Sequence, residues 1–577
     1  MKQHPPAPVR WLPGWLRRYP SAALPQDLTA GLVVTVMLVP QSLAYAMLAG
    51  MPPVTGLYAS VLPLLVYALF GSSMTLAVGP VAVTSLMTAA ALAPLASAGS
   101  PAYVDAALAL ALLAGAALAL AGLLRLGFLA QLLSRPVISG FTSGAGLLIL
   151  VGQLGPLLGV HVAGGAVPAQ LRALLAGLGG LHPATAALGL GALALLWLAK
   201  YRGEILLRRW GMRESRGAIA IRLAPMLVVL LAVALVAWLD LDRAGVAVVG
   251  PIAAGLPALA GRGLAAVPWT QLLLPALLIG LISFIGSLSM AQSLAIRRHQ
   301  RVDANAELRG LGAANIASGL SGAFPISGGF ARSVVNFAAG AQTPLAGVVS
   351  ALLMAVLLFA GTGLFERLPL AVLAATIIAA LASLVDVPEL RRAWRYDRSD
   401  AAALLATAAG VVLLGVERGI LLGIGLSLLT LLWRASHPHI AEIGRLAGTE
   451  HFRNVERHRV ETLPRALALR VDEHLFFGNV AALEQRIWRE LARRPQLTDV
   501  LLVLSSVGHV DATAMETLRE LNADLLRRGL RLHLAEVRGP VLDALRRSPL
   551  PAELSGQIHL SVHRAFVELA GPSDWQI

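Results

Sequence analysis

The sequence contains no cysteine, which excludes disulfide bonds, thiolate metal sites and a cysteine nucleophile. It also carries few charges: 14% of its 577 residues are Asp, Glu, Lys or Arg, whereas a soluble domain has roughly a quarter. Residues 28–124 have almost no charged side chains, while residues 437–577 have an ordinary soluble composition. The chain therefore divides into a membrane part and an aqueous part.

Several functional motifs are missing as well. No nucleotide-binding loop of the form G-x-x-x-x-G-K-[ST] occurs, so we expect no ATP-driven transport by this chain alone. The apolar segments hold no His, Asp or Ser cluster at catalytic or metal-ligand spacing, and we expect no enzyme, cofactor or metal site. The net charge of +14 is not arranged as a basic stripe with interleaved aromatics, which argues against a nucleic-acid partner.

Apolar segments of the length that crosses a bilayer fill the first 436 residues, about fourteen in all. They cover residues 28–49, 54–70, 80–96, 104–124, 128–150, 183–199, 222–240, 269–296, 308–323, 329–339, 344–362, 369–385, 400–416 and 419–435. With a cytoplasmic N-terminus, every arginine cluster beside these segments falls on the cytoplasmic side. We therefore expect a multi-pass protein of the inner (plasma) membrane, surrounded by the lipid bilayer, with both termini in the cytoplasm.

The composition also predicts the domain boundaries. We expect a cytoplasmic N-terminal segment at 1–26, a transmembrane domain at 27–436, a linker at 437–461 and a small soluble domain at 462–571. Within the soluble part, alternating strand and helix patterns predict an α/β layer.

Two apolar segments are interrupted by Gly and Pro at matching positions, the third and the tenth. Residues 76–88 (LAVGPVAVTSLMT) contain Gly79 and Pro80, and residues 322–337 (GAFPISGGFARSVVNF) contain Pro325 and a Gly pair. Each alone is typical of a helix kink. Matched broken helices instead indicate inverted repeats with a binding site between two half-helix N-termini, which attract anions.

Polar side chains near these breaks are candidate ligands. Arg332 lies one turn into the second half-helix, where a charge costs at least ~2.5–3.5 kcal/mol without a polar partner. A substrate anion, a lipid headgroup or a carbonyl group could each be the polar partner of Arg332. Gln41 and Tyr45 share a helix face after Pro40, for hydrogen bonds to an anion or to another helix. Ser333 follows Arg332 and has the same two interpretations.

The acidic residues do not suggest a proton carrier. The eighth segment (LLIGLISFIGSLSMAQSLAI) contains no carboxylate. Asp27 is predicted to cap the first helix, Glu307 to pair with an arginine of its own loop region, and Glu417 to form a salt bridge with Arg418.

The chain resembles the sulfate permease family of anion transporters with a C-terminal STAS domain. The matching stretches are DLTAGLVVTVMLVPQSLAYAMLAGMPPVTGLYAS (27–60), VGP (78–80), VDANAELRGLGAANIASGLSGAFPISGGFARSVVNFAAGAQTPLAG (302–347) and LPLAVLAATII (368–378). The resemblance implies an all-α membrane domain of seven-plus-seven inverted topology, with core (spans one to four and eight to eleven) and gate subdomains. It also implies elevator-like movement and a homodimer.

The resemblance also implies a set of site residues. The anion site would comprise Gln41, Tyr45, the backbone around Val81, and Ala331, Arg332 and Ser333. Many relatives carry Glu and Lys in the eighth span, where this chain has Gly286 and Gln292. If that Glu couples protons or cations to transport, exchange or uniport becomes more plausible here.

In the STAS domain, relatives carry a phosphorylated Ser where this chain has Thr513, within Asp511-Ala512-Thr513-Ala514. Thr513 is a regulatory candidate, although capping of the helix by its hydroxyl is the favoured alternative. A cytoplasmic protein partner, if the chain has one, is expected at this domain. The leading hypothesis is secondary transport of inorganic oxyanions, sulfate first and bicarbonate next. A dicarboxylate carrier and a membrane sensor that signals through its STAS domain are the alternatives.

Overall fold

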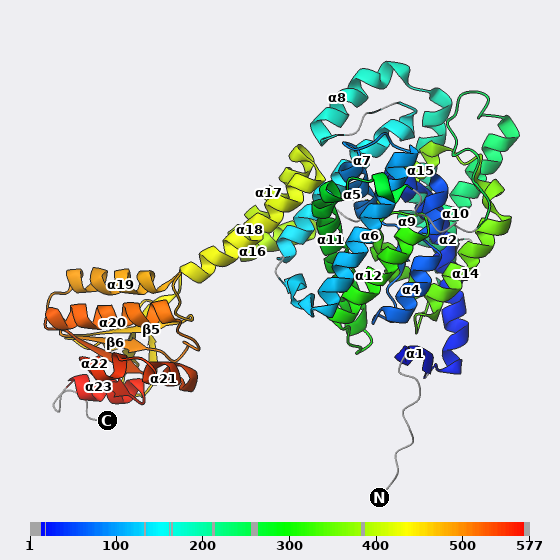
Figure 1. Cartoon of the computed structure of the whole chain (residues 1–577). Helices are drawn as coiled ribbons and strands as arrows, with labels where there is room; N and C mark the ends of the chain where they lie inside the picture. Colours follow the sequence, from blue (N-terminus) through cyan, green and yellow to red (C-terminus); the bar gives the residue numbers. More distant parts are fainter. Residues whose placement is uncertain are drawn as a thin grey trace, which may run out of the picture. The chain divides into compact units, whose positions relative to one another are not determined.

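A computed structural model of the chain describes residues 13–17, 19–131, 134–160, 162, 165–209, 214–255, 263–381 and 387–570. The chain forms two compact units, Met1–Ser427 and Leu428–Ile577, which are described separately (Figure 1). The first is built of helices and the second contains a sheet.

The first unit is helical because a chain inside a bilayer must pair its backbone groups within each segment. Its longer helices are α2 Leu24–Leu48, α6 Pro101–Leu123, α7 Arg135–Leu158, α9 Pro183–Arg209, α10 Glu214–Leu239, α11 Trp269–Ile296, α12 Ala304–Leu320, α14 Leu345–Ala360 and α17 Arg398–Leu414. Its shorter helices are α1 Gly14–Arg17, α3 Pro53–Tyr58, α4 Leu62–Phe70, α5 Ala82–Leu92, α8 Val167–Gly177, α13 Phe330–Ala338, α15 Leu370–Leu381 and α16 Val387–Tyr396. Helix α18 Val416–Ser436 begins in this unit and continues into the second.

Each of the fourteen expected segments overlaps at least one of these helices. In the part of the chain that the structure describes, seven helices are individually long and apolar enough to cross a membrane, and four shorter apolar helices accompany them. The largest shift concerns the fifth segment, expected at 128–150 and observed as α7 at Arg135–Leu158. Pro136 sets this start, because proline fits the first turn of a helix and not its interior.

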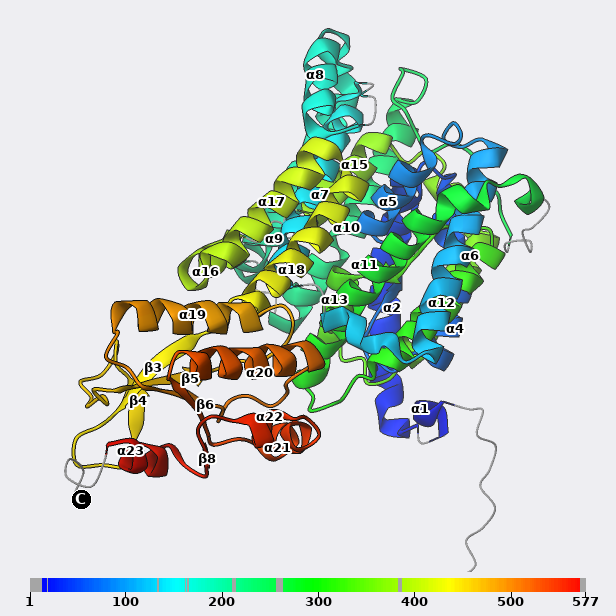
Figure 2. The ribbon, with the colours of Figure 1, turned by 60° about the vertical axis from the view of Figure 1, so that its left-hand side comes forward.

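Helix contacts fall mainly into two groups, α2 to α6 with α11 to α14, and α7 to α10 with α15 to α17. Helix α18 joins the second group, since a Cβ at Gly419 would lie 2.4 Å from the backbone nitrogen of Val411 in α17. In the first group α6 and α12 lie side by side in both views (Figures 1 and 2). Glycine permits this close approach: a Cβ at Gly312 would lie 2.5 Å from the backbone nitrogen of Ala119, and one at Gly115 would lie 2.6 Å from that of Ile316. Small residues at helix contacts are typical of membrane bundles.

The second unit is an α/β domain with a six-stranded sheet of order β4-β3-β5-β6-β7-β8. The strands are β3 Ile440–Arg445, β4 Phe452–Asn454, β5 Ala466–Val471, β6 Asp499–Val503, β7 Arg531–Ala535 and β8 Ile558–His559. The helices are α19 Val480–Arg493, α20 Ala512–Arg527, α21 Gly539–Arg546, α22 Leu550–Glu553 and α23 Val562–Ala570. Strands β5 to β8 run parallel, and β3 pairs antiparallel with β5. Alternate residues of β5 face α19 and α20 on one side and α23 on the other.

The segment 437–461, expected as a linker, carries β3 and β4 of this sheet. The expectation missed them because the two strands are short and carry polar residues between their buried positions Ala441, Ile443 and Asn454. The alternating strand and helix pattern expected for the soluble part is observed in β5, α19, β6, α20 and β7.

A buried polar network joins three parallel strands of the domain. His533 on β7 contacts Asp499 of β6 at 3.2 Å and His559 of β8 at 3.1 Å. Burial would raise the pKa of Asp499, but hydrogen bonds from His533, Arg531 and Thr498 outweigh it and lower the pKa to about 2. In the described residues no group of His, Asp and Glu has the arrangement of a metal site. His533 thus links the neighbouring strands β6 and β8 through its two ring nitrogens.

The α6–α12 contact predicts a measurable effect of a single methyl group. Gly312→Ala should lower the stability of the membrane unit by about 1–3 kcal/mol, because its Cβ would overlap backbone atoms of α6. Gly191→Ala in α9 is the matched control, since a Cβ there meets no atom within 4 Å. Thermal unfolding of the two purified proteins in detergent measures the difference. Equal melting temperatures would show that close α6–α12 packing does not limit stability.

Candidate anion-binding site

The two interrupted segments meet each other in the structure. Residues Val78–Gly79 form strand β1 and Ser327–Gly328 form strand β2, and the two pair antiparallel. We call this pair of strands the crossover. Two residues separate the end of β1 from the start of helix α5, and one residue separates β2 from helix α13. Neither helix has a side chain of a described residue bonded to its first backbone N–H groups. Two uncapped helix N-termini therefore start from one crossover, and both carry partial positive charge.

Arg332 adds a full positive charge at this crossover. Its side chain is 2% exposed, and its Nη1 donates to the carbonyl oxygen of Pro80 at 2.7 Å. Of the three partners considered for Arg332 from the sequence, a carbonyl group is therefore the one that Nη1 binds. Its Nε and Nη2 are buried and donate to no described residue. These two N–H groups form one edge of the guanidinium, the edge that binds an oxyanion through two parallel hydrogen bonds.

Glycine makes room for this side chain. A Cβ at Gly329 would lie 2.7 Å from Arg332 Nη2, and a Cβ at Gly79 would lie 3.3 Å from the same atom. Gly79 also has φ of +145°, a conformation that other residues rarely adopt. The Gly residues of the two broken segments therefore let the guanidinium fold against the crossover.

Helix α2 brings Gln41 and Tyr45 to the same place. Gln41 Oε1 accepts a hydrogen bond from Arg332 Nη1 at 3.3 Å. Tyr45 is 7% exposed, and among the described residues its hydroxyl has no hydrogen-bond partner. The structure thus brings together three of the predicted site residues from two distant parts of the chain.

The other three predicted residues differ in how they are placed. Val81 precedes α5 in extended conformation, so its backbone opens the first turn. Ala331 is exposed in the first turn of α13. Ser333 is fully buried, and its hydroxyl oxygen accepts from the backbone nitrogen of Ala77 at 2.9 Å. Ser333 therefore braces the crossover in this conformation.

Polar side chains of α11 and α12 form hydrogen bonds with the backbone at β2. Ser287 Oγ accepts from the backbone nitrogen of Gly328 at 2.8 Å, and Ser283 Oγ donates to the carbonyl of Ile326 at 3.0 Å. Asn315 both accepts from and donates to the backbone of Ile326. These residues pair the backbone that the broken helix leaves open, as an irregular segment in a membrane requires. Sequence reasoning missed them because isolated Ser and Asn residues are common in membrane helices.

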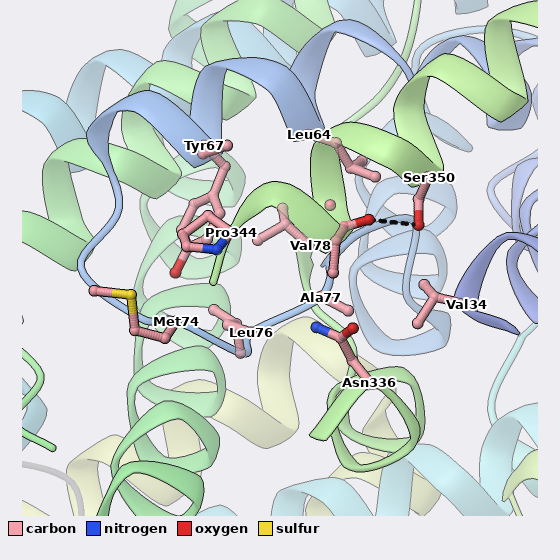
Figure 3. A pocket seen from close by; sticks show the side chains of 13 residues that line it. Val34, Leu64, Tyr67, Met74, Leu76, Ala77, Val78, Asn336, Pro344 and Ser350 are labelled. Atoms are coloured by element: carbon pink, nitrogen blue, oxygen red, sulfur yellow. Dashed lines mark hydrogen bonds between the residues drawn. The ribbon is translucent and has the colours of Figure 1, made fainter. Parts of the chain in front are cut away.

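A cavity of about 20 Å³ lies beside the segment Ala77–Val78, lined by α2, α4, α13 and α14 residues (Figure 3). Asn336 lines it, and its Oδ1 is buried without a hydrogen-bond partner among the described residues. The volume suits a single water molecule and not an oxyanion. Arg332 is not part of its lining, so this cavity is distinct from the crossover site.

Two buried carboxylates fix the loops next to the half-helices. Asp27 of α2 accepts from the backbone nitrogens of Gln342 and Thr343, at 2.6 and 3.1 Å, and from the Thr343 hydroxyl at 2.7 Å. Its predicted role as a cap of its own helix is therefore wrong. Asp27 instead satisfies N–H groups just before α14, because the chain returns to α2 after α13.

Glu307 of α12 has the corresponding role at the other loop. It accepts from the Tyr67 hydroxyl at 2.7 Å and from the backbone nitrogens of Ser72 and Ser73, at 2.8 and 2.9 Å. The expected pairing with an arginine is wrong, since Tyr67 and the loop before β1 supply these donors. Each carboxylate thus holds a loop that belongs to the other half of the sequence.

The eighth span shows where the missing carboxylate would have been. Gly286 and Gln292 lie on the exposed side of α11, and a Cβ at Gly286 would meet no atom within 4 Å.

The salt bridge expected between Glu417 and Arg418 does not form between these two described residues.

In the second unit, Thr513 is exposed in the first turn of α20. Asp511 is the cap of this helix, since its side chain accepts from the Ala514 backbone nitrogen at 2.8 Å. The interpretation of Thr513 as the helix cap is therefore wrong. Its role as a phosphorylation site stays a prediction.

Comparison with known proteins identifies the family. The chain matches the profile of the sulfate permease family over residues 24–407 and that of the STAS domain over residues 457–565. It belongs to the sulfate permease family. This is a family of multi-pass membrane transporters and not of enzymes.

Two relatives span nearly the whole chain. A probable sulfate transporter of Mycobacterium tuberculosis is 36% identical over 95% of this chain and 96% of its own length. The chloroplastic sulfate transporter 4.1 of Arabidopsis thaliana is 33% identical over 94% of this chain and 79% of its own length. Both the membrane domain and the STAS domain are therefore shared with these relatives.

Solved structures show the same fold. The overall structure of SLC26A9 matches with a TM-score of 0.86 at 22% identity, over 97% of this chain and 92% of that chain. The transmembrane domain of a cyanobacterial bicarbonate transporter, BicA, matches with a TM-score of 0.59 at 26% identity, over 70% of this chain and 97% of that chain. The expected fold, a helical membrane domain followed by a small α/β STAS domain, is confirmed.

The carboxylate at Glu307 yields a second prediction. Glu307→Gln replaces an acceptor by an amide whose NH₂ group faces donors, so stability should fall by about 1–3 kcal/mol. Thermal unfolding in detergent measures this loss. Glu366→Gln is the control, because Glu366 is only partly buried and its side chain has no hydrogen bond to a described residue. An unchanged melting temperature for Glu307→Gln would contradict the role of Glu307 in fixing the loop.

Proposed function

We propose that this protein is a secondary active transporter or exchanger of inorganic oxyanions, with sulfate as the first candidate substrate. The observation that carries the proposal is the buried Arg332, whose Nε and Nη2 have no acceptor among the described residues and lie beside two uncapped helix N-termini. An oxyanion supplies acceptors for both the guanidinium edge and the helix ends. The names of the relatives in Mycobacterium and Arabidopsis, which are sulfate transporters, support the same substrate.

The residues around Arg332 have separate roles in this proposal. The N-termini of α5, which follows Val81, and of α13, which has Ala331 in its first turn, provide backbone N–H groups. Each helix end is worth up to ~2 kcal/mol to a partly buried anion. Gln41 orients the guanidinium through its carbonyl oxygen, and Tyr45 offers its hydroxyl as a neutral donor. The site selects negative charge because its proposed residues include one full positive charge and no carboxylate.

We propose that transport follows an elevator-like path. The helices that build the site, α2, α5 and α13, belong to one packing group, and the second group has its own internal contacts. Movement of the first group against the second would carry the intact site across the membrane. The inverted repeat, the homodimer and cytoplasmic termini are part of this proposal.

Bicarbonate is the second candidate, favoured by the structural match to a bicarbonate transporter. Bicarbonate and sulfate both present several oxygen acceptors to a guanidinium edge. The absence of a carboxylate at Gly286 favours anion exchange or uniport over proton symport. No feature of the described residues supports a sensor role.

Arg332→Ala is predicted to weaken sulfate uptake strongly in proteoliposomes that contain the purified protein. Loss of the charge-assisted hydrogen bonds should raise the sulfate KM about ten-fold or more. Arg332→Lys keeps the positive charge but loses the two parallel N–H donors of the guanidinium, and should retain weak uptake. An imposed pH gradient should leave wild-type uptake unchanged.

Arg243→Ala is the control for this experiment, because Arg243 is exposed and its ion pair with Asp240 is long at 3.9 Å. Wild-type kinetics in Arg332→Ala would contradict the assignment of the anion site. If the folded wild-type protein moves bicarbonate but no sulfate, the substrate assignment changes and the site assignment is retained.

A further inference from the structure

Helix α16 carries a basic and aromatic surface that the proposed transport mechanism does not use. Arg391 and Arg395 are exposed, Trp394 is 59% exposed and Tyr396 is 91% exposed, whereas Ala393 is buried. This helix lies between the expected spans 369–385 and 400–416. A short helix with cations and exposed aromatic rings is typical of a segment at a membrane surface.

Most of the positive charge on this surface has no partner among the described residues. Glu389 pairs with Arg392 at 2.7 Å, and Asp397 caps α17, so these two carboxylates are already occupied. Three further arginines form no hydrogen bond or ion pair with a described residue: Arg391, Arg395 and Arg398. An external anion is the natural complement of these groups.

The packing of α7 on α17 shows where these charges lie along the membrane helices. A Cβ at Gly140 of α7 would meet the carbonyl oxygen of Leu404 of α17 at 2.3 Å. A Cβ at Gly144 would meet that of Ala408 at 2.8 Å. The two helices therefore run parallel, and residues four apart on one match residues four apart on the other.

This register places the beginnings of both helices at one level. Arg135 begins α7 and Arg398 begins α17. Arg135 is also exposed and has no ion pair with a described residue. Helix α16 packs against both α7 and α17 (Figure 2). We define the basic collar as the four arginines without partners among the described residues: Arg135, Arg391, Arg395 and Arg398.

We propose that the basic collar, with Trp394 and Tyr396, binds anionic phospholipid headgroups. The collar lies where apolar membrane helices begin, which is the level of lipid phosphates. Arginine clusters at this level recognise anionic headgroups, and Trp and Tyr rings occupy the same interfacial layer. Attraction of the transported anion is the competing use of the cations, but it does not account for two large aromatic rings exposed beside them.

The test is titration of the purified full-length protein with phosphatidylglycerol, observed by native mass spectrometry, with phosphatidylcholine as the neutral reference. The wild type should bind phosphatidylglycerol more tightly than phosphatidylcholine. The triple variant Arg391→Gln, Arg395→Gln and Arg398→Gln should lose affinity for phosphatidylglycerol by about five-fold for each arginine removed. Trp394→Ala should weaken the binding of both lipids.

The matched control removes three exposed arginines of the STAS domain that form no side-chain hydrogen bond or ion pair with a described residue: Arg457, Arg459 and Arg547. Replacing these three by Gln gives the same change of net charge and should leave lipid binding unchanged. Equal loss in both triple variants, or no loss in the collar variant, would overturn the proposal. A collar variant with normal lipid binding but slower anion uptake would assign these arginines to the substrate instead. The lipid measurement does not depend on which anion is transported.

Discussion

The structure around the crossover depends on one electrostatic constraint: a buried guanidinium and two helix N-termini share the same small volume. All three carry positive charge, and among the described residues only the Pro80 carbonyl and the Gln41 amide oxygen accept from the guanidinium. A membrane interior stabilises such an arrangement only when polar groups or an anion surround the charge. A negative ligand would complete this arrangement, and this links the fold directly to anion transport.

The remaining polar groups of the first unit keep that arrangement in place. Ser283, Ser287 and Asn315 pair the backbone of β2 and of the residue before it, and Asp27 and Glu307 hold the loops that adjoin the half-helices. Each carboxylate binds a loop from the other half of the sequence. The two halves thus depend on each other for the position of their helix ends.

Much of this could be predicted from the sequence. The two Gly/Pro breaks have a simple chemical signature, and a lone arginine in an apolar segment requires a polar partner or an anion. The roles of Asp27, Glu307 and Ser333 could not be predicted, because their partners lie in distant segments and depend on how the loops return. The strands β3 and β4 were missed because both are short and carry polar residues between their buried positions. Helix α16 was missed because a run of arginines between two apolar segments is typical of a loop.

The most direct test of an anion site at the helix N-termini uses the absence of native cysteine. A single cysteine at Ala331, exposed in the first turn of α13, can be compared with one at Ala338, exposed at the far end of the same helix. The rate of alkylation by a neutral maleimide is measured with and without saturating sulfate. We predict that sulfate slows the reaction at position 331 and leaves position 338 unaffected. Equal rates at position 331 with and without sulfate, in a protein that transports sulfate, would contradict an anion site at these helix ends.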